Sequence, residues 1–299
     1  MTQERAIDPV YAAQLTLNGL LLGLLYALIV SGLALLFGVL GIINFAHGEF
    51  LMAGAYLMAF ALPVLGLAYL PSLLLAMLGV ALLGCLAHAL FLRRLREDEF
   101  ERSILMTTGL SILLLNAVQY ALTATPLLVD TQFGFDGIDL GGINITWTRI
   151  AAAAAAILAL LLLWLCLTRT QLGRAMRAIA QNREAAMMVG IRPEAVARNA
   201  VILATALCGL AGAALAPIQL VQPSMGQFLI FKAFALVIIG GLGSIPGAAI
   251  AAVLLGLLES WIGGFFDAVW QEVVVFVAMM LVLLLRPDGL FGAPRMRAG

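Results

Sequence analysis

The chain has 299 residues, of which 64% are hydrophobic and only 11% are charged, and its mean hydropathy is +1.10. Soluble domains average about 25% charged residues, and a soluble core could not hide this much apolar surface. The sequence therefore predicts an all-α, polytopic transmembrane helical bundle. The formal net charge is zero, which gives no indication of nucleic-acid binding. We expect Cys85, Cys166 and Cys208, which are isolated in apolar runs, to be small buried residues without a metal or disulfide role.

Nine apolar segments approach the length of about 20 residues that crosses a bilayer as a helix. We expect eight or nine of them to span the membrane as one domain over residues 1–299. In chain order they are 14–38, 50–69, 72–92, 104–123, 150–168, 199–219, 229–245, 247–262 and 269–285.

Arginine counts in the connecting loops predict the orientation. The loop 169–198 carries six of the sixteen basic residues and should be cytoplasmic, as should the tail with Arg286, Arg295 and Arg297. The loop 124–149 is acidic and should lie outside. These assignments agree if all nine segments span and the N-terminus is outside. A re-entrant segment among the first apolar runs would place the N-terminus inside, and the sequence leaves both topologies open.

Polar residues interrupt the first apolar region at Asn44-Phe45-Ala46-His47-Gly48-Glu49. Asn44, His47 and Glu49 are costly at membrane depth, so they indicate either a polar element of a translocation path or subunit seam, or a short interfacial turn whose side chains reach water. The run H-G-E lacks the i, i+4 spacing of helical metal ligands, so we expect no metal site.

The basic loop has helical periodicity over 172–191. Arg174, Arg177 and Glu184 fall on one side of this predicted helix, and apolar residues fall broadly on the other. The helix could rest on the anionic lipid of the inner leaflet or dock into a groove of a soluble partner. The small residues Ala185 and Ala186, followed by Gly190, favour docking, because they permit close approach and a turn.

The segment 229–245 contains Lys232, the only lysine, and ends in a glycine-rich run. Lys232 either extends to the outer membrane interface or pairs with Glu259 in the next segment. Gly240, Gly241 and Gly243 precede a proline, so we expect a broken helix here, which membranes tolerate where it faces a cavity or packed protein.

A short repeat suggests an internal duplication. The motif G-x-F-L occurs at residues 48–51 and again at 226–229, each time between two apolar segments. With the N-terminus outside, the two copies would run in opposite directions, as in the inverted repeats of transporters. A chance match of four positions is the alternative.

Several enzymatic signatures are absent from the sequence. It contains no G-x-x-x-x-G-K-[ST], no G-x-S-x-G and no H-E-x-x-H. We therefore expect no catalytic residues, no bound cofactor and no ATPase activity in this chain. A basic cytoplasmic helix in a chain without a nucleotide site indicates transport driven by a separate motor.

The motifs resemble those of the LivH-like permease subunits of bacterial ABC importers for branched-chain amino acids. The most specific stretches are N-F-A-H-G-E at 44–49 and K-A-F at 232–234, which continues into G-G-L-G-S-I-P-G at 240–247. The run Gly173-Arg174-Ala175-Met176-Arg177-Ala178 also matches, and the resemblance covers nearly the whole chain. The E-A-A-x-x-x-G motif at 184–190 departs from the wider importer pattern, because the I-x-L-P that should follow is missing.

The resemblance implies a multi-pass permease of a bacterial inner membrane that imports branched-chain or related amino acids. It implies four further subunits: a second related permease, two cytoplasmic ATPases that bind the ATP, and an extracytoplasmic substrate-binding protein. Residues 172–191 would be the coupling helix, with contacts from Gly173, Arg174, Arg177, Glu184 and the small residues after it.

The rival interpretation is a stand-alone channel or secondary transporter for a small polar solute. Lys232, Glu49 and Glu259 would then form an ion or proton relay, and transport would follow an ion gradient without ATP.

Overall fold

The computed structural model describes residues 8–94, 100–122 and 125–292, so Arg295 and Arg297 of the predicted cytoplasmic tail lie outside the described residues. The elements are α1 (Pro9–Leu40), α2 (His47–Ala61), α3 (Tyr69–Leu90), η1 (Leu92–Arg94), α4 (Phe100–Ala121), β1 (Gly137–Asp139), β2 (Asn144–Thr146), α5 (Trp147–Arg169), α6 (Gln171–Gln181), α7 (Arg183–Met188), α8 (Pro193–Leu215), α9 (Met225–Gly240), α10 (Ile245–Phe265) and α11 (Ala268–Leu285). Each of the nine predicted apolar segments falls mainly on a separate helix.

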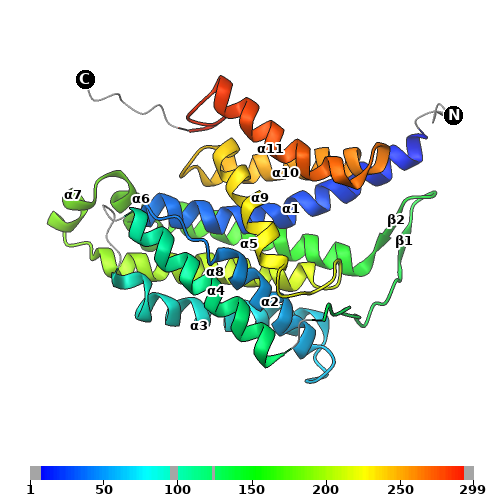
Figure 1. Ribbon diagram of the computed structural model, residues 1–299, viewed down its shortest axis with the longest axis horizontal. Helices are drawn as coiled ribbons and strands as arrows, with labels where there is room; N and C mark the ends of the chain where they lie inside the picture. The colour runs from blue at the N-terminus through cyan, green and yellow to red at the C-terminus, as the bar shows by residue number, and fades with distance from the viewer. Residues whose placement is uncertain (1–7, 95–99, 123–124, 293–299) are drawn as a thin grey trace.

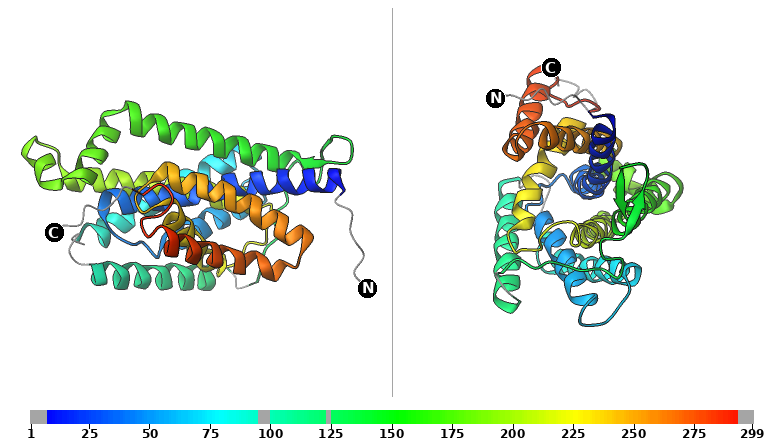
Figure 2. Two further views of the ribbon diagram at one scale, coloured as in Figure 1. Left: turned by 90° about the horizontal axis from the view of Figure 1, so that it is seen from above. Right: turned by 90° about the vertical axis from the view of Figure 1, so that its right-hand side faces the viewer.

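The helices form one bundle with two distinct ends (Figure 1). The helices α6 and α7 project at one end, and the β1–β2 hairpin lies at the other end with the start of α1 (Figure 2). The loops predicted for opposite sides of a membrane therefore lie at opposite ends. Six of the described helices are long and apolar enough to cross a membrane, whereas α2 has 15 residues and α9 has 16. The hairpin, in which Ile138 pairs with Ile145, is a small departure from the predicted all-α fold.

The longest helices pair antiparallel through small residues. Gly23 of α1 packs directly on Gly256 of α10, and a Cβ on either glycine would meet the backbone of the other helix. Gly84 of α3 packs against α8, where a Cβ would collide with the side chain of Thr205. Small residues let helix backbones approach closely. In lipid the hydrophobic effect does not drive helices together, so this close packing supplies much of the energy of their association.

The short helices α2 and α9 both begin inside the bundle. The non-helical segments 41–46 and 216–224 lead into them from opposite ends, because α1 and α8 run in opposite directions. The two helices meet at Gly48 and Gly226, where a Cβ on either residue would collide with the carbonyl oxygen of the other. Both glycines open a copy of the G-x-F-L motif, so the structure has the opposed arrangement that an inverted repeat requires.

Two boundary predictions are wrong. The segment 172–191 is two helices rather than one, because Asn182 is extended (φ −159°, ψ 107°) and its Oδ1 accepts a hydrogen bond of 2.9 Å from Ala185 N. Asparagine is a favoured N-cap, so it ends α6 and starts α7. The second segment ends at Ala61 rather than near 69, because Pro63 lacks an amide donor and Gly66 is left-handed (φ 63°).

The glycine-rich run separates α9 from α10. The helix α9 ends at Gly240, and Gly241 and Gly243 have φ angles of 103° and 85°, which favour glycine. Ser244 then caps α10 by accepting a hydrogen bond of 3.2 Å from Gly247 N. That this turn breaks a membrane-spanning segment stays a prediction.

Candidate functional site

Three side chains from α1, α9 and α10 form a buried charged cluster, here called the lysine cluster: Tyr26, Lys232 and Glu259. Lys232 Nζ lies 2.7 Å from Glu259 Oε1, and it also donates to Tyr26 Oη at 3.2 Å. The Tyr26 hydroxyl donates in turn to Glu259 Oε2 at 3.0 Å. The structure thus pairs Lys232 with Glu259, the second of the two alternatives drawn from the sequence.

The lysine cluster is largely cut off from solvent, with side-chain exposure of 19% for Lys232 and 3% for Glu259. Removing both charges from water is costly, and such a pair persists only with close geometry and further hydrogen bonds. Tyr26 supplies both additional bonds, one to each charge. Two cavities of about 450 and 360 Å³ flank the cluster, and Tyr26, Lys232 and Gln219 line both of them.

A second polar group lies where α2 begins. Asn44, His47 and Glu49 are each at most 1% exposed. The Asn44 side chain accepts from Ala46 N at 3.1 Å, and His47 Nε2 lies 3.1 Å from the carbonyl oxygen of Ile29. These side chains are enclosed by the bundle, which argues against an interfacial turn that reaches water.

Helix α4 satisfies polar groups at the start of α2. Ser111 Oγ donates to Glu49 Oε1 at 3.1 Å. The Thr107 hydroxyl accepts from Phe45 N and lies 3.2 Å from the carbonyl oxygen of Ile43. The two Thr107 contacts provide hydrogen-bond partners for backbone groups of segment 41–46, which has no regular backbone hydrogen bonding of its own. The partner of Glu49 is Ser111, so the structure brings Lys232 and Glu259 together but places Glu49 in a different group.

The predicted coupling residues lie on α6 and α7, which project from the bundle (Figure 2). Arg174, Arg177 and Glu184 are exposed. Arg177 donates to the carbonyl oxygen of Leu167 at the end of α5, and Gly173 packs against that turn so closely that a Cβ would collide with it.

The other face of α6 anchors the projection to the bundle. Met176 is 1% exposed and Ile179 is 6% exposed. Ala186 of α7 is buried too, whereas Ala185 and Gly190 are exposed. The segment therefore has one face fixed to the membrane helices and one face open to a partner.

Sequence reasoning missed several members of these groups. Tyr26, Thr107 and Ser111 are single polar residues within apolar helices. That pattern could have marked them as candidate site residues, although no spacing rule indicates their partners. It also missed the tip of α7, where Met188 and Val189 are 82% and 76% exposed. Exposed apolar residues rimmed by charged ones are typical of protein-binding surfaces.

Comparison with known proteins gives the class. A family profile described as "Branched-chain amino acid transport system / permease component" matches residues 15–284. The chain is 34% identical to the high-affinity branched-chain amino acid transport system permease protein BraD of Pseudomonas aeruginosa, over 95% of this chain and 96% of that protein. It is 30% identical to LivH of Escherichia coli K12 over the same shares, and 29% identical to a probable LivH of Methanocaldococcus jannaschii over 90% and 89%. No solved structure matches.

The bundle and these matches define a multi-pass inner-membrane permease, a transport component rather than an enzyme. The chain belongs to the family of branched-chain amino acid transport system permease components.

Proposed function

We propose that the chain is one permease subunit of an ATP-binding cassette importer that moves branched-chain or related amino acids into the cytoplasm. The observation that carries this proposal is the projecting α6–α7 segment, which has an anchored apolar face, an exposed charged face and an apolar tip. The sequence contains no nucleotide-binding motif, so in this proposal a separate ATPase supplies the energy. The relatives named as transport permeases support the same assignment.

The proposed assembly contains a second related permease chain, two ATPase subunits below the α6–α7 end, and a substrate-binding protein at the hairpin end. Nine passes follow if the segments before α2 and α9 complete the crossings that these short helices begin. The N-terminus is then outside. Alternating access would come from rocking of the two permease chains around a central path, with the polar start of α2 and the lysine cluster at that path or at the seam.

Charge reversal on α6 tests the coupling assignment. The Arg174→Glu/Arg177→Glu double variant should abolish ATP-dependent amino-acid uptake in vesicles and reduce co-purification of the ATPase subunits. The introduced carboxylates would repel a partner surface whose charge is complementary to the two arginines. Membrane insertion should stay intact. Arg286→Glu, an exposed charge reversal after α11 at the same end of the bundle, is the matched control. Uptake that is unchanged in the double variant would refute the assignment.

The rival, a stand-alone secondary transporter or channel, draws support from the buried ion pair of the lysine cluster. It predicts uptake that follows an imposed ion gradient and continues in vesicles without ATP. Uptake that requires ATP on the α6–α7 side and ignores ionophores decides for the importer.

A further inference from the structure

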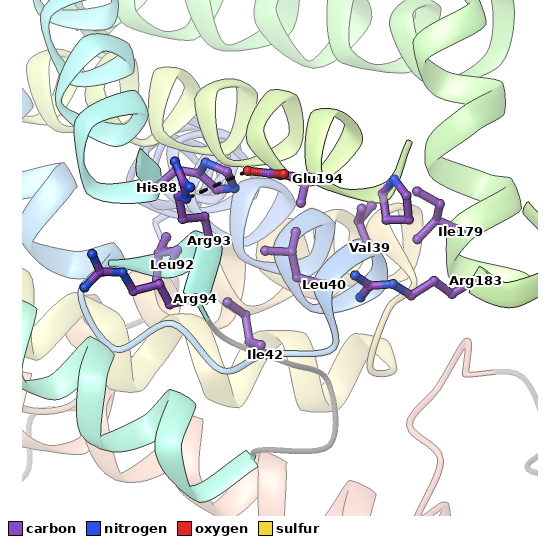
Figure 3. Close-up of a pocket in the computed structure, with 12 residues that line it drawn as sticks. Val39, Leu40, Ile42, His88, Leu92, Arg93, Arg94, Ile179, Arg183 and Glu194 are labelled. Atoms are coloured by element: carbon purple, nitrogen blue, oxygen red, sulfur yellow. Dashed lines mark ion pairs between the residues drawn. The ribbon is translucent and has the colours of Figure 1, made fainter. Parts of the chain in front are cut away.

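A cavity of about 300 Å³ lies at the α6–α7 end of the bundle, apart from both groups described above. Four parts of the chain line it: the end of α1 with Ile42 after it, the end of α3 with η1, the α6–α7 segment, and the start of α8 (Figure 3). Its volume is at the small end of the range for ligand sites. The cavity therefore touches both the α6–α7 segment and the ends of membrane helices beside it.

The polar lining carries both signs of charge. Arg93 and Glu194 lie on one side of the cavity, next to His88, and Arg183 extends toward it from the other side (Figure 3). Arg93 Nε and Glu194 Oε1 are 3.9 Å apart, and their side chains are 56% and 72% exposed. Such an exposed and distant pair contributes little stability, so its carboxylate and guanidinium can turn to a ligand at little cost.

The lining also contains Arg94, and its remaining residues are apolar. Val39, Leu40 and Ile179 are 8%, 9% and 6% exposed, and all three line the cavity. They offer a fixed wall beside the charged groups (Figure 3). The cavity thus combines a group that accepts hydrogen bonds, groups that donate them, and a surface for a small hydrocarbon.

These features select the chemistry of the occupant. An anion alone meets the carboxylate of Glu194, and a cation alone meets the guanidinium groups of Arg93, Arg94 and Arg183. A zwitterion satisfies both, with charge-assisted hydrogen bonds to each end. An apolar side chain on the same molecule then covers Val39 and Leu40, which also removes apolar surface from water.

We infer that this cavity binds a free amino acid with a small apolar side chain from the cytoplasmic side, and that its occupation slows transport. That this ligand is the same amino acid that the protein transports rests on the proposed function. A bound molecule would touch Ile179 or Arg183 of the α6–α7 segment together with the ends of α1 and α3. It would hold the coupling segment in one position, so that cargo accumulated in the cytoplasm restrains its own import.

A binding measurement on the purified transporter complex tests the site, with L-[³H]leucine as the probe and competitors that remove one feature at a time. L-Isoleucine and L-valine should compete. 4-Methylpentanoate lacks the ammonium group and 3-methylbutylamine lacks the carboxylate, so neither should compete. Competition by inorganic phosphate, or loss of leucine binding when phosphatidylethanolamine is added to the nanodisc, would overturn the inference in favour of a phosphate or a lipid headgroup.

Two variants assign the binding to this cavity. Glu194→Gln removes the acceptor charge, and Ala197→Leu fills the cavity without changing charge, so each should weaken leucine binding about tenfold or more. Glu101→Gln, at an exposed carboxylate near the start of α4 that does not line the cavity, is the control and should bind as wild type. Equal binding by all three variants, at wild-type elution volume, would overturn the inference.

Transport separates this inference from the proposed function. Proteoliposomes with the α6–α7 end inside should import more slowly when preloaded with leucine, and Ala197→Leu should abolish the difference between loaded and empty vesicles. Import at equal rates into loaded and empty wild-type vesicles would overturn only the inference. No ATP-dependent import into empty wild-type vesicles would refute the proposed function, while the binding result would stand on its own.

Discussion

Two ion pairs of this permease differ in almost every physical respect. Lys232 and Glu259 are 2.7 Å apart and largely buried, and a tyrosine hydroxyl bonds both of them. Arg93 and Glu194 are 3.9 Å apart, mostly exposed, and beside a cavity. The first pair is fixed by its surroundings and joins three helices. The second can exchange its partner for water or a ligand at little cost, which is the property that a binding site needs.

The largest effect should come from breaking the buried pair on one side. Lys232→Met leaves the Glu259 side chain, which is 3% exposed, without its cationic partner, and removal of one partner of a buried pair costs about 3–5 kcal/mol. We expect a loss of this size in the free energy of unfolding, measured by denaturant titration in detergent. A loss under about 1 kcal/mol, as for exposed pairs, would contradict the distinction between the two pairs.

The double variant Lys232→Met/Glu259→Leu is the control for that measurement. Replacing a buried pair by apolar residues of similar volume is often neutral, so most of the stability should return. A double variant that is as unstable as the single one would show that packing, and not the orphaned charge, causes the loss.

A smaller effect should follow from Tyr26→Phe. The change deletes the hydroxyl that donates to Glu259 Oε2 and accepts from Lys232, and keeps the ring. Hydrogen bonds to charged groups contribute about 1.5–3 kcal/mol, so the unfolding free energy should fall by this amount. Tyr120→Phe, at a residue that is 95% exposed, should change nothing. Equal stability of the two variants would show that the ion pair needs no third member.

The smallest effect should come from Arg93→Gln. Exposed pairs contribute about 0.2–1 kcal/mol, so we expect the free energy of unfolding to fall by no more than this amount. Added salt should change it by no more than this amount either. A loss comparable to that of Lys232→Met would mean that the pair beside the cavity is structural, and would remove the reason to consider it free to bind a ligand.

Much of the fold was predictable because the bilayer imposes it. Helix length and apolar composition placed the nine apolar segments on separate helices, and arginine counts distinguished loops that the structure places at opposite ends of the bundle. The boundaries at Asn182 and Ala61 were missed because single residues with local hydrogen-bonding or backbone effects decide them. The start of α2 within the bundle could not be read from periodicity, since a segment without regular structure has none, and its partners on α4 lie far along the chain.

The candidate site was predictable only as separate residues. The sequence marked Lys232 and Glu259 as rare charges in apolar helices, and offered their pairing as one alternative. It could not indicate Tyr26, because a tyrosine in a transmembrane helix is common at interfaces and its partner depends on how α1 packs on α10. The same limit explains Ser111, whose role is visible only when α4 is placed against α2.

The central meeting of α2 and α9 has a consequence for the synthesis of the chain. Gly48 and Gly54 of α2 pack on residues of α9 and α8, which leave the ribosome only after α5 and the α6–α7 segment have been made. Until then α2 has only part of its contacts. Segment 41–46 has no regular backbone hydrogen bonding, and lipid offers backbone groups no partners. We therefore expect α2 to be among the last helices to reach its final packing, after α8 and α9 have been made.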